Sequence, residues 1–432
     1  MKIYAPGSST KTLITRALML TACGFAIGAT ANGLTVNEQS ASSAGTAYAG
    51  RSSSALDAST IYGNPAGLTK LKHREVSGGV AVFDVNIDIN DAKSGASGTN
   101  KGNSVPVSPV PFGYIFSPVD ENFSIGVGLY APFGVANDTE KTFQGRYHGS
   151  YSKTQVITLQ PTIAYRINDR VSIGGGPTLN RFDADLQNYL ATGALNFSTD
   201  TQIAVKGDDT ALGYNVGLLV DLGEATSWGI TYHSKVDYHL KGHTKVSGSP
   251  GSLGLNGKYG AKLDVTTPES VDTSLTHHFN DRWTGYVSTT WTRWSRIKTV
   301  DVQNSDVSAS GKSAGLDNLS EPFNWQDTWS TAIGASYLLT PQLILRAGYA
   351  YDPSPVHNTD RGVRIPIANR KSVTFGAGYS PSRNLTIDVA YAYLWESTAS
   401  VRLANSSGVQ PEYEAKFVNS AHGLVTQVSY RF

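Results

Sequence analysis

Cysteine and methionine are nearly missing from this sequence. Its 432 residues include one Cys and two Met, and all three lie near the start of the chain, at Met1, Met19 and Cys23. We expect residues 1–31 to be removed as a signal peptide, which leaves a mature chain without a thiol. This excludes thiol catalysis, a disulfide scaffold and metal sites with Cys ligands.

Long apolar runs are missing as well. The stretch from Ala17 to Ala29 covers only 13 positions, whereas a membrane-spanning helix needs about 20. Basic residues before it and the small residues Ala29–Ala31 after it are typical of a secretory signal cleaved after Ala31. A lipoprotein processing box at Leu20–Cys23 is the alternative, but it would leave only the short apolar stretch 17–22 before Cys23.

The mature chain has almost no net charge. The sequence contains 35 Lys and Arg against 34 Asp and Glu, and residues 1–31 hold three of the bases, which leaves 32 against 34. This balance provides neither a nucleic-acid footprint nor a polybasic membrane patch. A second route across a bilayer remains, because a closed β-barrel satisfies every backbone hydrogen bond internally.

From about residue 74 the sequence consists of strand-like segments separated by turn residues. We predict fourteen strands, at 74–89, 105–116, 123–134, 154–167, 171–187, 211–222, 228–246, 258–278, 283–302, 327–339, 343–356, 371–380, 385–397 and 419–432. Short and long connections alternate strictly between them. This alternation is typical of a bacterial outer-membrane barrel with tight periplasmic turns and long external loops, and it predicts an all-β, fourteen-stranded antiparallel transmembrane barrel over residues 74–432.

Apolar and polar residues alternate along the predicted strands. In the last one Leu424, Val428, Tyr430 and Phe432 share one face, which we expect to contact lipid. The alternation of Val428, Tyr430 and a terminal Phe432 is also a hallmark of barrels recognised by the outer-membrane insertion machinery, so we predict this machinery as a partner. Further expected partners are outer-membrane lipid and lipopolysaccharide, and the barrel should be a monomer.

Residues 32–73 are small and polar and do not resemble strands. Short helical pieces are predicted near 38–47 and 53–61, the second ending where Gly63-Asn64-Pro65 stops a helix. A fourteen-stranded barrel has a lumen wider than its own side chains fill. We therefore predict that this segment plugs the lumen; a disordered periplasmic tail is the alternative.

Prolines mark a weak place in the predicted wall. A closed barrel has no edge that hides a missing donor, so a Pro within a strand removes a ladder bond. The second strand contains Pro106, Pro109 and Pro111, and the third contains Pro132 before Phe133-Gly134. Folding the two strands together sets Pro132 opposite residues 107–108. We predict a kinked, under-bonded seam there; the alternative is that Pro132 simply ends the third strand.

Several segments together resemble the FadL-type outer-membrane transport family. They are the pieces at 45–50 and 55–68, which include Asn64-Pro65-Ala66-Gly67, and those at 130–134, 291–295, 325–329, 351–356 and 364–366. The likeness covers essentially the whole mature chain. It implies a barrel plugged by an N-terminal hatch, and passive uptake of hydrophobic compounds such as long-chain fatty acids or aromatic and aliphatic hydrocarbons.

The resemblance also implies roles for particular residues. Hatch gating maps onto Asn64–Gly67, and a third-strand kink that opens the wall sideways maps onto Pro132, Phe133 and Gly134. A basic residue that holds the ligand carboxylate maps onto Arg181. A second basic position of the family corresponds approximately to Glu321, and this departure moves the expectation from fatty acids toward neutral hydrocarbons.

No catalytic or cofactor constellation is apparent. His233, His239 and His243 share one face of a predicted strand, but no further metal ligands can be assigned to them, and a solvated face is the simpler interpretation. We predict no cofactor, no metal and no enzymatic activity. The leading hypothesis is an outer-membrane channel for hydrophobic compounds; the alternatives are a general diffusion porin and an outer-membrane hydrolase.

Overall fold

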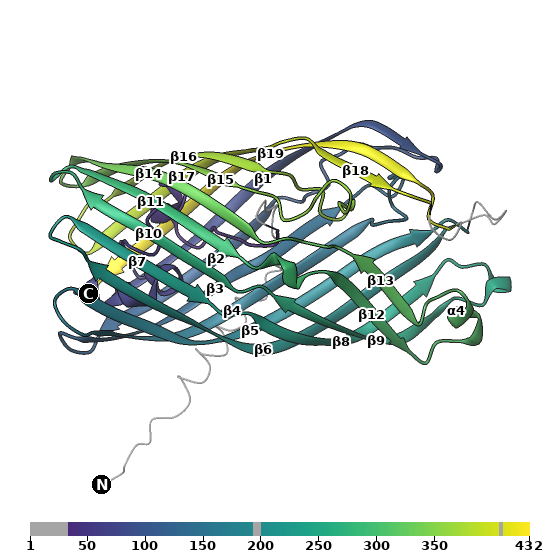
Figure 1. Cartoon of the computed structure of the whole chain (residues 1–432), viewed down its shortest axis with the longest axis horizontal. Helices are drawn as coiled ribbons and strands as arrows, with labels where there is room; N and C mark the ends of the chain where they lie inside the picture. The colour runs from purple at the N-terminus through teal and green to yellow at the C-terminus, as the bar shows by residue number, and fades with distance from the viewer. Residues whose placement is uncertain (1–32, 193–199, 406–408) are drawn as a thin grey trace, which may run out of the picture.

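In the computed structural model of the chain, a continuous antiparallel sheet closes on itself as a barrel (Figure 1). The structure describes residues 33–192, 200–405 and 409–432. The predicted signal peptide therefore lies outside the described residues. No helix among the described residues is long and apolar enough to cross a membrane.

Among the described residues, nineteen β-segments form the wall. They are β1 (Glu75–Ser94), β2 (Ser108–Pro118), β3 (Phe123–Asp138), β4 (Tyr151–Arg166), β5 (Val171–Leu190), β6 (Thr201–Asp221), β7 (Thr226–His233), β8 (Val236–Ser247), β9 (Gly257–Thr267), β10 (Ser270–His278), β11 (Trp283–Thr292), β12 (Thr299–Ser305), β13 (Asn318–Pro322), β14 (Thr328–Thr340), β15 (Leu343–Asp352), β16 (Arg370–Tyr379), β17 (Leu385–Glu396), β18 (Ala399–Leu403) and β19 (Tyr413–Arg431).

Five wall strands are each split into two segments, which are β7/β8, β10/β9, β11/β12, β14/β13 and β17/β18. Nineteen segments less five breaks give the fourteen strands that the sequence predicts. The barrel closes where β19 pairs with β1 from Glu75–Arg431 to Ser94–Tyr413. Connections are short at one end and long at the other, in the predicted alternation, and Figure 1 places the C-terminus at the short-turn end.

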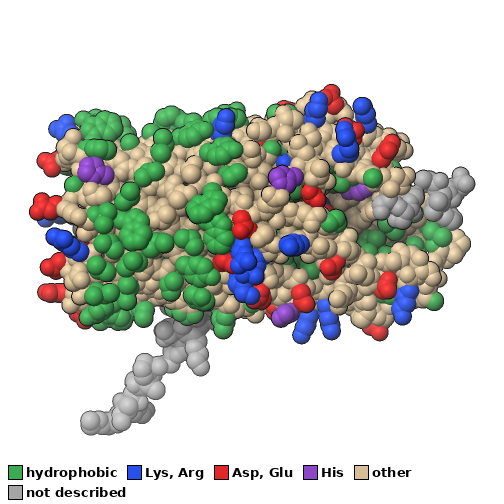
Figure 2. All heavy atoms as spheres, in the orientation of Figure 1, with side chains coloured by type: hydrophobic (Ala, Val, Ile, Leu, Met, Phe, Trp, Pro, Cys, Tyr) green, Lys and Arg blue, Asp and Glu red, His purple; other side chains and the backbone are tan. Residues whose placement is uncertain are grey.

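Most strands extend farther toward the long-loop end than predicted, for example β1 to Ser94 instead of 89 and β3 to Asp138 instead of 134. β6 begins at Thr201 instead of 211, and β19 begins at Tyr413 instead of 419. In the extensions of β6 and β19 most outward positions are polar, for example Lys206 and Lys416, because this part of the wall rises beyond the apolar band. Figure 2 shows that band nearer the short-turn end, with charged side chains at its borders. Apolar residues face outward there, among them Ile125, Leu159 and Phe375.

The hatch (residues 33–73) lies inside the barrel, as Figure 1 shows. Its regular elements are α2 (Ala41–Ala44), α3 (Thr60–Gly63) and the 3-10 helix η1 (Pro65–Lys70). Helix α2 packs against β16, β17 and β19, and η1 against β4, β5 and β6. The helix predicted at 53–61 is wrong over most of its length, because polar contacts to the wall hold the backbone before α3: Ser52 and Ser53 bond to side chains of β10.

The remaining short helices lie in connections and breaks of the wall. They are η3 (Gly251–Leu253), η4 (Trp294–Arg296) and α4 (Ala309–Ser313).

Candidate functional site

The wall has an unpaired stretch between β2 and β3. Their ladder runs from Pro118–Ser124 to Gly113–Leu129 and stops there, although β2 remains paired to β1 as far as Ser108. The chain reconnects farther out, where the N–H of Asp138 donates to the carbonyl of Ser104 at 2.6 Å. The unpaired stretch, which we call the seam, is therefore bounded at both ends.

The predicted interruption of pairing is thus present, but its register differs. Continuing the ladder from Gly113–Leu129 would place Pro132 opposite Val110, not opposite 107–108. The proline positions fit the gap chemically, because Pro109 and Pro111 lie in the unpaired part of β2 and offer no N–H to β3.

A β-bulge bends β3 at the seam. Tyr130 pairs with Thr158 and Phe133 with Val156, so the register between β3 and β4 shifts over Ala131 and Pro132. An extra residue of this kind bends its strand and leaves local backbone groups without ladder partners. The backbone groups of Ala131 and Pro132 need other partners, because an unsatisfied buried backbone group is costly.

The hatch supplies those partners. Its extended residues form an antiparallel bridge between Thr35 and Phe133. The N–H of Val36 donates to the carbonyl of Pro132 at 2.8 Å, and the N–H of Gly134 donates to the carbonyl of Leu34 at 2.8 Å. A three-residue strand of the hatch therefore occupies the free edge of β3.

Gln39 completes this attachment. Its side-chain amide donates to the carbonyl of Ala131 at 2.6 Å and accepts from the N–H of Ala131 at 3.3 Å. The carbonyl of Gln39 in turn accepts from the hydroxyl of Tyr114 on β2 at 2.9 Å. One hatch residue thus touches both strands that border the seam.

Replacing Gln39 with Ala should loosen the hatch strand at the seam. The Gln39 side chain forms three hydrogen bonds, two with Ala131 and one to the carbonyl of Val36 at 3.2 Å. Together they contribute about 1.5–4.5 kcal/mol, so amide exchange at residues 34–36 should accelerate by at least roughly tenfold. Hydrogen–deuterium exchange read by mass spectrometry measures this. Gln144→Ala is a suitable control, because it removes an external-loop amide bonded to Asn100. Unchanged exchange at 34–36 in the Gln39 variant would show that Gln39 does not hold the segment.

An apolar cluster lies on the lumen side of the seam. It contains the buried residues Trp294, Trp325 and Val356, with Leu34 and Phe133 packed against it. The ring of Phe133 meets that of Trp294 edge-on at 6.3 Å between centroids, and Trp294 meets Trp325 at 5.1 Å. Trp294 turns inward because the break between β11 and β12 frees it from the wall pattern. Segments far apart in the sequence, including four that carry the family resemblance, thus meet at one place.

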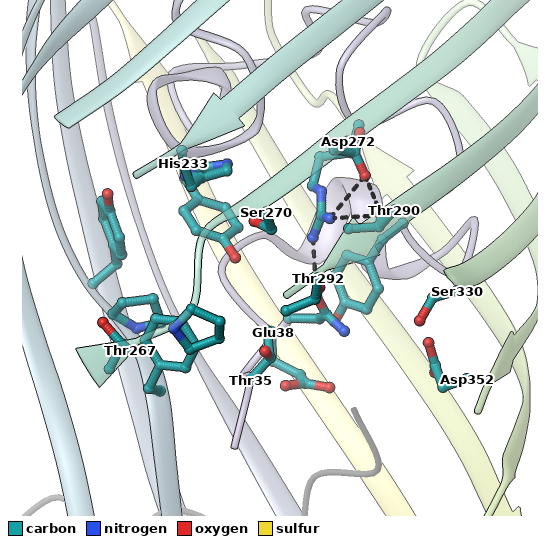
Figure 3. A pocket seen from close by; sticks show the side chains of 18 of the residues that line it. Thr35, Glu38, His233, Thr267, Ser270, Asp272, Thr290, Thr292, Ser330 and Asp352 are labelled. Carbon is teal, nitrogen blue, oxygen red and sulfur yellow. Dashed lines mark hydrogen bonds and ion pairs between the residues drawn. The ribbon is translucent and has the colours of Figure 1, made fainter. Parts of the chain in front are cut away.

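A polar cavity of about 110 Å³ borders the same kink. Tyr130, Pro132 and Phe133 line it on the β3 side. Figure 3 shows Glu38, Asp272 and Asp352 around the common space, together with His233 and hydroxyl groups of Ser and Thr residues. The cavity has room for several water molecules, since one needs roughly 10–15 Å³. It therefore combines an aromatic border with a largely hydrogen-bonding interior.

Charge in this cavity is only partly balanced. Arg51 of the hatch pairs with Asp272 of β10 at 2.9 Å and donates to Asn37 at 3.0 Å. Removal from bulk water raises the pKa of Glu38 to about 7, and nearby Asp352 adds to the effect while Arg370 opposes it. Glu38 thus changes charge near neutral pH, and a bound anion would meet a more favourable cavity below pH 7 than above it.

Arg181, predicted to bind the ligand carboxylate, does not line this cavity. Its side chain is about half exposed and pairs with Asp208 at 2.7 Å and Asp183 at 3.4 Å. It shares the outward face of β5 with Leu179 and Ile173. Strand alternation places it outside the barrel, so the geometry contradicts the prediction of a lumen-side ligand contact at Arg181. Glu321, where the sequence departs from the family's second basic position, forms an ion pair with Arg364 at 2.9 Å.

The predicted hatch motif anchors the hatch to β6 of the wall. Asn64 donates to the carbonyls of Ser52 at 2.6 Å and Leu218 at 3.0 Å, and its side-chain oxygen accepts from the N–H of Ala66 at 3.0 Å. The fit is close: a Cβ atom at Gly217 of β6 would lie 2.0 Å from the Asn64 oxygen. The motif thus has a clear structural role, and its gating role remains a prediction.

The other hatch-motif residues lie inside the barrel, and the residues of the C-terminal signal lie on its outer face. Pro65, Ala66 and Gly67 begin η1 and are buried. Val428, Tyr430 and Phe432 lie on the outward, lipid-facing side of the wall, where they are 50%, 45% and 67% exposed. This confirms the face predicted for them, whereas recognition by the insertion machinery stays a prediction.

Comparison with known proteins agrees with this architecture. The family model for outer membrane transport proteins of the OMPP1/FadL/TodX type matches residues 22–432. The chain belongs to this family. It is accordingly an outer-membrane transport protein.

Relatives within the OMPP1/FadL/TodX family match over nearly their whole length. A long-chain fatty acid transport protein of Escherichia coli O6:H1 is 29% identical over 89% of this chain and 92% of its own. Outer membrane protein P1 of Haemophilus influenzae is 29% identical over 87% and 88%. Among solved structures, a Pseudomonas aeruginosa FadL homologue superposes with a TM-score of 0.84 at 23% identity, covering 93% of this chain and 100% of that one.

The toluene transporter TbuX of Ralstonia pickettii superposes with a TM-score of 0.67 at 20% identity, covering 93% and 99%. Both structural likenesses establish the fold of this family member and nothing about its ligand.

The site also contains residues that the sequence does not predict, namely Glu38, Gln39, Arg51, Asp272 and Asp352. The hatch residues carry no periodic signal, because the segment has little regular structure. Asp272 gives a weak signal, since it is a charged residue at an inward position of a strand. Among the described residues no group of three or more His, Cys, Asp or Glu could hold a metal ion.

Proposed function

We propose that this transport protein admits hydrophobic compounds from outside, holds them in the cavity beside the kink, and releases them sideways through the seam. The observation that carries the proposal is the end of the β2–β3 ladder at Gly113–Leu129, with the Phe133–Trp294 cluster and the cavity directly behind it. Pro132, Phe133 and Gly134 form the inner border of this exit.

The physical basis is avoidance of water. Release into the membrane lets an apolar solute leave without entering the aqueous periplasm, which would cost about 25 cal/mol per Å² of apolar surface. The axial route is occupied by the hatch, which Arg51 ties to β10 and Asn64 ties to β6. We propose that movement of the hatch strand 34–36 from β3 opens the sideways route, with Asn64–Gly67 as the fixed end.

Two ligand classes fit the site. Relatives and structural neighbours include a long-chain fatty acid transport protein and a toluene transporter. The aromatic border suits either class, whereas the hydrogen-bonding interior favours a molecule with a polar end. We place long-chain fatty acids first and neutral aromatic or aliphatic hydrocarbons second, which reverses the order that the Glu321 departure suggests.

A binding panel at two pH values separates the classes. The purified protein is titrated with a long-chain fatty acid, an alkane and toluene at pH 6 and pH 8. Because Glu38 is largely neutral at pH 6, the fatty acid should bind about tenfold more tightly there, one pKa unit being a tenfold change; neutral ligands should not respond. Glu38→Gln should remove the pH effect. Binding of none of the three would refute the proposed function.

A general diffusion porin is the second candidate, and the filled lumen disfavours it. A porin keeps a water-filled channel, but here hatch residues such as Ala58 and Leu68 are fully buried within the barrel. We further propose that the chain acts as a monomer without enzymatic activity, because its wall closes on itself and the family comprises transport proteins.

A further inference from the structure

Two pairs of lysines face each other on the outer wall. Lys241 of β8 stands directly opposite Lys262 of β9, and Lys245 stands opposite Lys258. All four are at outward, exposed positions, while neighbouring residues of the other parity, such as Leu240, are buried. Like charges directly opposite each other across a ladder are destabilising. A bound anion would therefore stabilise a hairpin that carries two such pairs.

The protein itself does not provide that anion. Across residues 33–192, 200–405 and 409–432, none of the four lysines forms an ion pair within 4.0 Å. Nearby acids are engaged elsewhere: Asp208, the cross-strand neighbour of Lys241, is held by Arg181 at 2.7 Å, and Asp264 by His239 at 2.7 Å. The connection 193–199 contains no Asp or Glu.

The pair Lys241 and Lys262 lies just beyond the apolar band, and the second pair lies four residues farther out. On β6 the last outward apolar residue is Leu212, 72% exposed, and the outward positions farther from the periplasm are Thr210, Asp208 and Lys206. Asp208, beside Lys241, is four residues from Leu212, or about 13 Å at the usual strand rise. Figure 2 shows charged side chains gathered along this border of the band. Lys241 and Lys262 are therefore at the level where the outer-leaflet headgroups begin, and Lys245, opposite Ala204 of β6, and Lys258 lie about 13 Å farther out along the strands.

We propose that Lys241, Lys245, Lys258 and Lys262 form a binding strip for the phosphate groups of lipopolysaccharide. Lysine suits this ligand as a compact, mobile cation that binds phosphate as a point charge. The two pairs are about 13 Å apart along the strands, so each pair can take one phosphate of a bisphosphorylated disaccharide headgroup. Binding neutralises both like-charge pairs. The strip faces away from the lumen and does not depend on the transport proposal.

The test uses the full-length protein in detergent and lipid A as probe, in its bisphosphorylated and its dephosphorylated form. The quadruple variant K241Q/K245Q/K258Q/K262Q is compared with K93Q/K101Q/K141Q/K312Q, which removes the same charge from other exposed sites. At about fivefold per lysine near an anionic surface, the strip variant should bind bisphosphorylated lipid A several hundredfold more weakly. The control variant should bind as the unmodified protein does.

A charge-preserving variant and a folding check complete the design. Replacing all four lysines with Arg should keep most of the affinity, because the charge remains. Heat-modifiable gel mobility reports barrel closure, and the pair variant K241Q/K262Q serves if the quadruple variant does not fold. Equal binding of dephosphorylated lipid A, or undiminished binding by the folded Gln variants, would overturn the proposal.

Discussion

Deleting Ala131 together with Pro132→Val should reduce ligand uptake to the background of cells that lack the protein. The deletion removes the extra residue of the β3 bulge, and Val restores a backbone donor at the next position. β3 can then continue alongside β2 and close the seam. Adding Pro109→Thr and Pro111→Thr supplies the donors still missing from β2. Uptake of a labelled long-chain fatty acid by whole cells measures the effect.

A matched deletion distinguishes seam closure from general damage. Ser252 lies in the connection between β8 and β9, outside any ladder, so removing it shortens the chain equally without changing a register. Ligand binding to the purified seam variant should persist, because the cavity remains. Uptake at the normal rate by a folded seam variant would exclude lateral release.

Deleting residues 33–67 should convert the barrel into an open pore. The fourteen-stranded wall leaves a lumen wider than its inward side chains fill, and glycines make room for the hatch instead: a Cβ atom at Gly229 would lie 1.8 Å from the carbonyl oxygen of Ser52. Without the hatch, ions should pass at porin-like conductance in planar bilayers, where the intact protein conducts little. Directed uptake through the seam should be lost.

Asn64→Ala is the matched control for this deletion. It removes the hydrogen bonds to Ser52 and Leu218 but keeps the hatch in place through Arg51–Asp272 and Lys70–Asp221. We expect brief conductance events at most. A hatchless barrel that stays closed would mean that external loops, not the hatch, block the lumen.

The alternation of apolar and polar residues along the strands, together with the lengths of the connections, predicted the barrel. This works because the membrane favours apolar side chains and the lumen favours polar ones at adjacent positions. The prediction fails where that contrast reverses. Beyond the apolar band Lys416 faces water and Phe417 faces the interior, so the period persists but the outward stripe becomes polar. The first parts of β6 and β19 were therefore missed. The same parity, applied to Leu179 and Arg181, would have placed Arg181 outside the barrel.

The site itself was predictable only in part. Pro132 signals the kink because a missing N–H is visible in a sequence. The partners of the bulge are not visible, since Gln39 lies 92 positions from Ala131 and belongs to a segment without periodicity. Likewise, Glu38 and Asp352 approach each other only because the hatch turns back into the lumen. Contacts of this kind depend on the closed fold, and no local pattern encodes them.

The hatch strand at residues 34–36 has a consequence for how copies of the chain coexist in a crowded membrane. A free strand edge presents unpaired N–H and C=O groups that can recruit an edge of another molecule. In lipid the tendency of these groups to form hydrogen bonds with another strand is stronger, because no water competes for them. By occupying the edge of β3 with its own backbone at Val36 and Leu34, the chain uses internal β-augmentation to prevent barrels from joining edge to edge.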